Sequence, residues 1–191
     1  WVLGPGAAHA DGWIGSAPSE RSCALLHVAT RLADCSSDFC EAAAALKTPP
    51  RELLLVSGAG SRQLDTVQCL RSLPAAPPIE VGVAFNPFFP ERSDREKERA
   101  RLRLKIGTGH VSAVWLQIGS DVALLEDALK FLRSTIKSPR RLRLYGSVFI
   151  PSKQLLARMK FRPWNGVFLS SDYLDSVEAA EEVTRRTIAL Y

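Results

Sequence analysis

Residues 52–85 read ELLLVSGAGSRQLDTVQCLRSLPAAPPIEVGVAF, and this stretch decides the fold class. It contains an apolar run at Glu52–Ser57, a helical segment at Arg62–Leu73 that ends before a proline-rich turn, and a second apolar run at Ile79–Phe85. Both runs are largely apolar instead of alternating, which is typical of parallel strands that are buried on both faces. A strand, a helix and a second strand in this order predict one βαβ unit.

The same alternation continues on both sides of this unit. Further strands are predicted at Ala24–Thr30, Ser112–Gln117 and Arg141–Phe149, with one more candidate at Trp1–Leu3. Further helices are predicted at Asp38–Lys47, at Ser93–Ile106, after Asp121, and from Asp175 to Tyr191. Ser93 with Glu96, and Asp175 with Glu178, have the spacing of capping boxes, and Asp121 has the position of an N-cap. The pattern predicts an α/β protein with a parallel sheet.

Two architectures with a parallel sheet fit this alternation of strands and helices, an open doubly wound sheet and a closed barrel. The only glycine-rich turn after an early strand is Ser57–Ser61, and it lacks the third glycine and the acidic residue of a dinucleotide-binding fingerprint. A TIM-type (β/α)8 barrel is therefore favoured, although the 191 residues hold only about six of the eight strands. Residues 1–20 are predicted to be loop or poorly ordered, and residues 21–191 to form the barrel domain.

Composition and charge pattern indicate which binding partners and which cellular compartments fit this chain. The net charge is +5, but the basic residues of 92–105 are interleaved with acids, which is typical of a solvated helix and not of a nucleic-acid site. The longest apolar runs are too short for membrane insertion, and the start of the chain lacks the pattern of a secretory signal. Four cysteines without metal-site spacing predict reduced thiols, in the mitochondrial matrix or the cytoplasm.

Short motifs at the strand ends resemble the methylenetetrahydrofolate reductase family. They are His27-Val28-Ala29-Thr30-Arg31 followed by Asp38–Gly60, Val83–Pro87 with Pro90-Glu91, Leu116-Gln117 followed by Asp121, and Tyr145–Pro151. The tail Pro163–Leu169 with Val177–Ala180 is also similar to relatives of this family. The resemblance covers roughly residues 20–191, and it rests on the order of the motifs more than on any single one.

The resemblance implies an FAD-dependent TIM barrel of one-carbon metabolism, which passes a hydride from NADH or NADPH through the flavin to methylenetetrahydrofolate. It implies a flavin-side role for His27, a substrate contact for Gln117, and flavin-phosphate contacts for Lys105 and Arg31. Gly58 and Ala59 would lie beside the flavin. Each residue also has a structural interpretation: His27 could make a local hydrogen bond, Gln117 could tie down a loop, and Lys105 could be solvated.

Several departures from the family pattern predict that catalysis is lost. Ala59 stands where the family has an aspartate, Asn86 stands where it has a tyrosine, and residues 118–120 replace an aromatic run. The strand that carries a catalytic glutamate is not in this sequence. We therefore expect a non-catalytic structural or accessory subunit, associated with other protein subunits and with FAD binding weak or lost.

Two alternatives stay open at this point. One is an active FAD-dependent reductase, and the other is a folate- or flavin-binding module without chemistry. The aromatic residues Phe88, Phe89 and Trp164 lie in loop-like stretches, where they fit either a partner surface or local packing.

Overall fold

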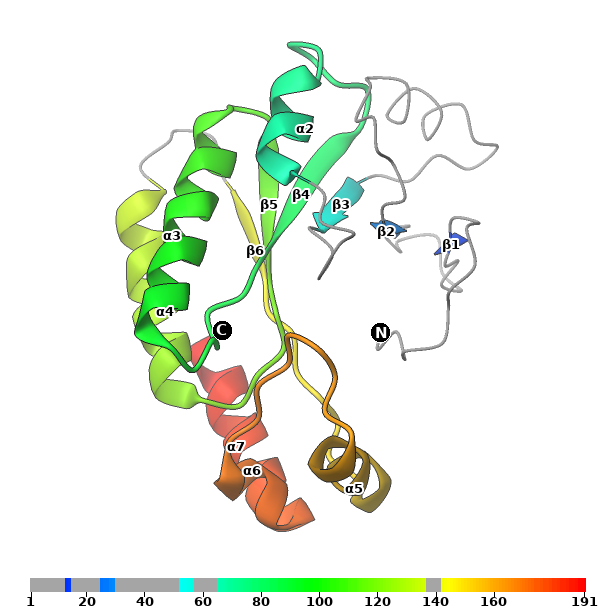
Figure 1. Ribbon diagram of the computed structural model, residues 1–191, viewed down its shortest axis with the longest axis vertical. Coiled ribbons are helices and arrows are strands. Elements are labelled where there is room, and N and C mark those ends of the chain that lie inside the picture. Colours follow the sequence, from blue (N-terminus) through cyan, green and yellow to red (C-terminus); the bar gives the residue numbers. More distant parts are fainter. Residues whose placement is uncertain (1–12, 15–24, 30–51, 57–64, 137–141) are drawn as a thin grey trace. The chain divides into compact units, whose positions relative to one another are not determined.

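A computed structural model describes residues 13–14, 25–29, 52–56, 65–136 and 142–191 (Figure 1). The predicted helix at 38–47 and the candidate strand at 1–3 lie outside these ranges. In the segment 1–20, which was predicted to be loop, the two described residues Trp13 and Ile14 form a short strand. No helix within the described ranges is long and apolar enough to cross a membrane.

The described strands form one sheet in which each strand lies next to its neighbour in sequence, in the order β1-β2-β3-β4-β5-β6. Their bounds are β1 Trp13–Ile14, β2 Leu25–Ala29, β3 Glu52–Val56, β4 Glu80–Phe85, β5 Val111–Leu116 and β6 Arg143–Tyr145. β1 is antiparallel to β2, whereas β2, β3 and β4 pair in parallel, with Leu26 opposite Leu53 and Leu53 opposite Val81. The predicted α/β class with a parallel sheet is confirmed.

Helices connect the strands from β3 onward (Figure 1). Their bounds are α2 Thr66–Ser72, α3 Arg92–Gly107, α4 Val122–Thr135, α5 Lys153–Phe161, α6 Ser171–Asp175 and α7 Val177–Leu190. The strands at 24–30, 52–57, 79–85 and 112–117 were predicted to within a residue or two. Two short helices, α5 and α6, were not predicted, and β6 is much shorter than the predicted strand at 141–149.

Side-chain contacts at helix starts explain where the predicted boundaries were wrong. Asp121 caps α4 as predicted, and its carboxylate accepts from the Leu124 N–H at 2.9 Å. α7 is capped by Ser176 and not by Asp175. The Ser93 capping box does not form, because α3 begins earlier and Glu96 instead pairs with Arg92 at 2.8 Å.

Two compact units can be distinguished within the chain. The first comprises Trp1–Ala84 with Arg101–Val114, and the second comprises Phe85–Ala100 with Trp115–Tyr191. The first has a core of strand and helix residues that include Leu53, Leu55, Leu70, Val81, Val83 and Leu102. The core of the second includes Phe149, Leu156, Met159, Val167 and Tyr173. Aliphatic residues on strands β3 and β4 thus supply much of the first core, as the apolar runs indicated.

Cys69 is fully buried in α2 and is disulfide-bonded. The prediction of a reduced thiol was therefore wrong for this residue. The sequence spacing of the cysteines gave no indication of it, because a disulfide joins residues by their distance in space. The compartment stays a prediction, and it no longer has support from a reduced Cys69.

Candidate functional site

Two neighbouring strand ends carry side-chain amides in the second unit. β4 is followed by Asn86 and β5 by Gln117, and the Gln117 N–H donates to the Phe85 carbonyl at 2.8 Å. That hydrogen bond holds the two ends side by side. In parallel α/β folds, ligands bind at the carboxyl ends of the strands. This edge is therefore the candidate site that the sequence indicated.

Asn86 is engaged through both ends of its side-chain amide. Its Nδ2 donates to the Gly166 carbonyl at 2.9 Å, and its Oδ1 accepts from the Phe88 N–H at 3.1 Å. Its backbone N–H donates to the Glu98 Oε1 at 3.3 Å. These contacts fix a turn in the chain, so Asn86 has a structural role here.

Gln117 is half-buried and only partly engaged. Its Oε1 accepts from the N–H of the next residue, Ile118, at 2.9 Å. Its Nε2 makes no hydrogen bond within the described part of the chain, and a Cβ added at Gly166 would lie 4.0 Å from it. Among the described residues the Nε2 therefore keeps both of its N–H donors free, which agrees with a ligand contact.

The segment 164–170 runs alongside the loops that follow β4 and β5. Gly119 forms a parallel β-bridge with Phe168, and the rings of Phe168 and Phe89 are 5.5 Å apart between centroids. The Ser120 hydroxyl is buried, accepts from the Ser170 N–H at 2.6 Å and donates to the Ser170 hydroxyl at 3.1 Å. These ties, with that of Asn86, bind the segment along both loops.

Local backbone geometry and packing hold the segment 164–170 in its turn. Gly166 has φ = +77°, which favours glycine, and the Val167 N–H donates to the Trp164 carbonyl at 3.0 Å to close the turn. The Trp164 ring packs edge-on against Phe149, with centroids 5.5 Å apart. Its indole Nε1 is buried and has no hydrogen-bond partner among the described residues. The turn is thus anchored on the core of the second unit.

The loop aromatics pack within the protein. Phe88 is 2% exposed, and its ring lies so close to Gly119 that a side chain there would collide with it. Phe89 packs on Phe168 and Trp164 on Phe149. Within the described residues, local packing therefore accounts for all three aromatics that the sequence left undecided. Trp115 on β5 stacks on Tyr145 of β6 at 4.1 Å, and both are half-buried.

Lys105 of α3 lies in the first unit and is 3% exposed. Its Nζ donates to the Ala84 carbonyl at 3.0 Å, near the end of β4. The lysine is therefore not solvated, and its ammonium ties the helix to the strand. The proposed contact with a flavin phosphate stays a prediction, and this geometry gives the ammonium a different partner.

The other predicted cofactor residues are described in part or not at all. His27 lies in β2, opposite Leu54 of β3, and nothing is described of its side chain. Arg31, Gly58 and Ala59 lie outside the described ranges, so their predicted roles beside a flavin stay predictions.

The chemistry available at the candidate site is that of amides and hydroxyls. Glu98 supplies a carboxylate near the end of β4, but its Oε1 already accepts the Asn86 N–H. No cluster of three or more metal-ligating side chains occurs in the described ranges. Asn86, Gln117 and Ser120 can hold a loop or donate a hydrogen bond, but neither an amide nor a hydroxyl provides a general acid or base near neutral pH.

Comparison of the chain with models of known protein families gives no match, and neither does a search of curated proteins. The resemblance to methylenetetrahydrofolate reductases therefore remains an interpretation of short motifs. The ties from Asn86 and Ser120 to the segment 164–170 were missed by sequence reasoning. The dipeptide Asn165-Gly166 is a turn signal that indicated the turn itself, but not the residues to which it binds.

Proposed function

We propose that the chain is a non-catalytic, barrel-type relative of the methylenetetrahydrofolate reductases and serves as a structural or accessory subunit of a larger assembly. One observation carries this proposal. The chain's own segment 164–170 is hydrogen-bonded along the loops that follow β4 and β5, through Asn86 and Ser120. In a barrel of this lineage the cofactor would enter at these strand ends.

The strand order supports the barrel-type winding. From β2 to β6 every strand neighbours the next in sequence, without the reversal that creates the binding crevice of a doubly wound sheet. Right-handed crossovers between such strands place all connecting helices on the same face, which is the arrangement of a barrel wall. The antiparallel β1 departs from that arrangement, because a barrel strand would pair with β2 in parallel.

The available side chains support the loss of chemistry. Ala59 replaces the family's aspartate in the sequence, and Asn86 is committed to Gly166 and Phe88. The Glu98 carboxylate already accepts the Asn86 N–H through Oε1, and the other polar groups are amides and hydroxyls. General acid–base catalysis contributes about 10²–10⁴-fold to a rate, so such a site should retain little reductase activity.

An exposed sheet edge supports the role as a subunit. Within the described part of the sheet, β6 has a neighbouring strand on one side only. Leu144 on this strand is 41% exposed, and Val148 and Ile150 just beyond it are 38% and 89% exposed. Unpaired edges with apolar side chains promote association, and proteins normally cover them.

A second function is favoured by Gln117 alone. Its half-buried Nε2 has no partner among the described residues, although its Oε1 is satisfied. A free amide donor at a strand end suits a folate- or flavin-binding module that has lost its chemistry.

Purification from native cells, followed by absorbance spectroscopy, native mass spectrometry and a reductase assay, tests these proposals together. A structural subunit should be colourless, should not oxidise NADH or NADPH with methylenetetrahydrofolate, and should run as a stoichiometric complex with another polypeptide. A yellow protein that turns over the substrate would refute the proposal. Saturable folate or FAD binding in calorimetry, lost in Gln117→Ala but kept in the exposed-surface control Asn165→Ala, would establish the binding module instead.

A further inference from the structure

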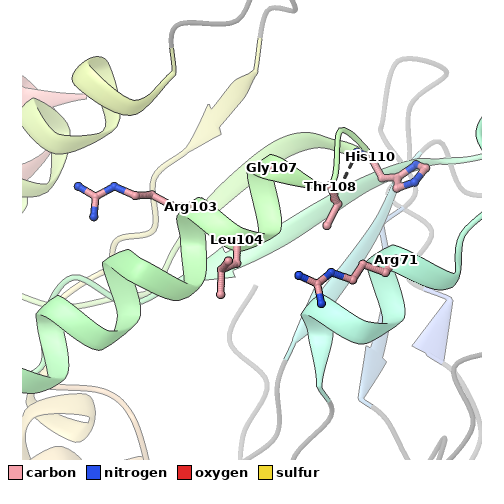
Figure 2. A pocket seen from close by; sticks show the side chains of 6 residues that line it. All are labelled: Arg71, Arg103, Leu104, Gly107, Thr108 and His110. Atoms are coloured by element: carbon pink, nitrogen blue, oxygen red, sulfur yellow. Dashed lines mark hydrogen bonds between the residues drawn. The ribbon is translucent and has the colours of Figure 1, made fainter.

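A cavity of about 430 Å³ lies in the first unit, beside the C-terminal ends of α2 and α3 (Figure 2). The described residues that line it are Arg71, Arg103, Leu104, Gly107, Thr108 and His110. Its volume falls within the range of small-molecule sites. Neither Lys105 nor Gln117, the two predicted ligand contacts whose side chains are described, is among these lining residues, so this proposal does not rest on the proposed function.

The described lining residues carry positive charge, and none of them is a carboxylate. Arg71 is exposed in the last turn of α2 and forms no ion pair with any described residue. In Figure 2 the Arg71 side chain starts below His110 and directs its guanidinium toward Leu104, the His110 ring points to the other side, and Arg103 points away from the other labelled residues. Arg71 is therefore the charged group placed to contact an anion beside Leu104, and Arg103 adds to the positive potential.

The end of α3 is capped in a way that lowers its repulsion of an anion. The Lys105 carbonyl accepts from the Thr108 N–H at 3.2 Å and from the Thr108 hydroxyl at 2.7 Å. The Ile106 carbonyl accepts from the Gly109 N–H at 3.1 Å. Free carbonyls at a helix C-terminus carry partial negative charge. The carbonyls of Lys105 and Ile106 are satisfied, so they leave less uncompensated negative charge beside the side-chain donors.

The apolar side of the cavity is provided by Leu104, which is 52% exposed. A leucine beside a guanidinium offers an apolar contact next to an anion-binding group. A ligand that matches both would have an anionic head and an apolar body. Arginine binds the several oxygens of a phosphate better than a compact point charge would.

We propose that this cavity binds a phosphate monoester that carries an apolar group. The phosphate contacts the Arg71 guanidinium, and the apolar group covers Leu104.

Three probes separate the parts of this proposal: phenyl phosphate, inorganic phosphate and benzoate. Each is titrated into the isotope-labelled full chain at constant ionic strength, and chemical shifts of the Arg71 side chain and the His110 ring are followed by NMR. We expect saturable shifts with phenyl phosphate, and at least about fivefold weaker binding for inorganic phosphate, which lacks the apolar contact, and for benzoate, which has fewer acceptors. Equal affinity for all three probes, or shifts that do not saturate, would overturn the proposal.

Matched variants test the residues. Arg71→Gln should weaken phenyl phosphate at least about fivefold through loss of a charged hydrogen bond, whereas Arg133→Gln should change it less than about twofold. Arg133 is a fair control because it is also an exposed arginine in the last turn of a helix, α4, and lies outside the cavity. Leu104→Ser should reduce the advantage of phenyl phosphate over inorganic phosphate. If the two arginine variants weaken binding equally, the loss of net positive charge explains the weakening, and the proposed site is refuted.

Discussion

Replacement of Gly119 by alanine tests whether the loop after β5 is packed as tightly as the structure shows. A Cβ at this position would come within 2.7 Å of three ring carbons of Phe88. Ordinary contacts of a Cβ begin at 3.4 Å, so the ring would have to move by roughly 1 Å. Phe88 is 2% exposed and cannot swing into solvent. Gly119 also forms the β-bridge with Phe168, so the backbone has little freedom to retreat.

Overpacking of a closed core costs about 1–3 kcal/mol. Alanine also restricts the unfolded chain, which stabilises by about 0.4–1 kcal/mol when the backbone conformation suits it. Gly107→Ala provides the matched control, because a Cβ there meets nothing within 4 Å and its φ is not positive. The difference between the two variants should therefore isolate the overpacking cost.

Urea unfolding followed by tryptophan fluorescence measures this difference. Gly119→Ala should unfold at a midpoint lower by about 0.5–1 M than Gly107→Ala, with an unchanged slope. Gly146→Ala is informative beside it, because its Cβ would also collide with a ring, that of Tyr191. Tyr191 is 47% exposed at the end of the chain and can move away, so a smaller loss is expected. If Gly119→Ala is as stable as Gly107→Ala, the packing of this loop is not as described.

Three further predictions concern the segment 164–170 and the core beneath it. Asn86→Ala should lower the free energy of unfolding by about 1–3 kcal/mol, because it removes two hydrogen bonds, whereas the exposed neighbour Asn165→Ala should change it by less than about 0.5 kcal/mol in the same urea titration. Ser120→Ala should leave the Ser170 N–H without its acceptor, and hydrogen exchange of that amide should accelerate, whereas unchanged protection would contradict the tie. Burial raises the pKa of Tyr173. Its contribution to the free energy of unfolding should therefore be complete below about pH 10 and should be lost as the pH rises through the raised folded-state pKa. Tyr173→Phe should remove that loss when unfolding is measured from about pH 8 to 11.

The sequence predicted the parts of the fold that depend on local pattern. Apolar runs such as Ile79–Phe85 located the strands because a parallel strand is buried on both faces. Such a strand can be identified from its own residues, without knowledge of the strands with which it pairs. Asp121 was identified as a cap because an N-cap depends only on the next three residues. Ser176 was missed in favour of Asp175 because both have side chains that can cap, and the choice depends on where α6 ends.

The parts that depend on distant contacts were not predictable. Asn86 and Gly166 are 80 positions apart, and Ser120 and Ser170 are 50 apart, so no spacing rule connects them. Lys105 was expected in solvent because its neighbours on α3 are charged. Its ammonium is instead buried against the Ala84 carbonyl, which a helical pattern alone cannot reveal.

The contrast between Asn86 and Gln117 limits what this edge of the sheet can still do. Both amides follow neighbouring strands, and both could face a ligand by position alone. The Asn86 amide forms hydrogen bonds within the chain through both Nδ2 and Oδ1, whereas the Nε2 of Gln117 forms none with a described residue. A ligand retained here would therefore have to bring an acceptor to Gln117 and could gain nothing from Asn86 without releasing Gly166. Because such a release would break a tie of the segment 164–170, binding at this edge and the stability of that segment should oppose each other.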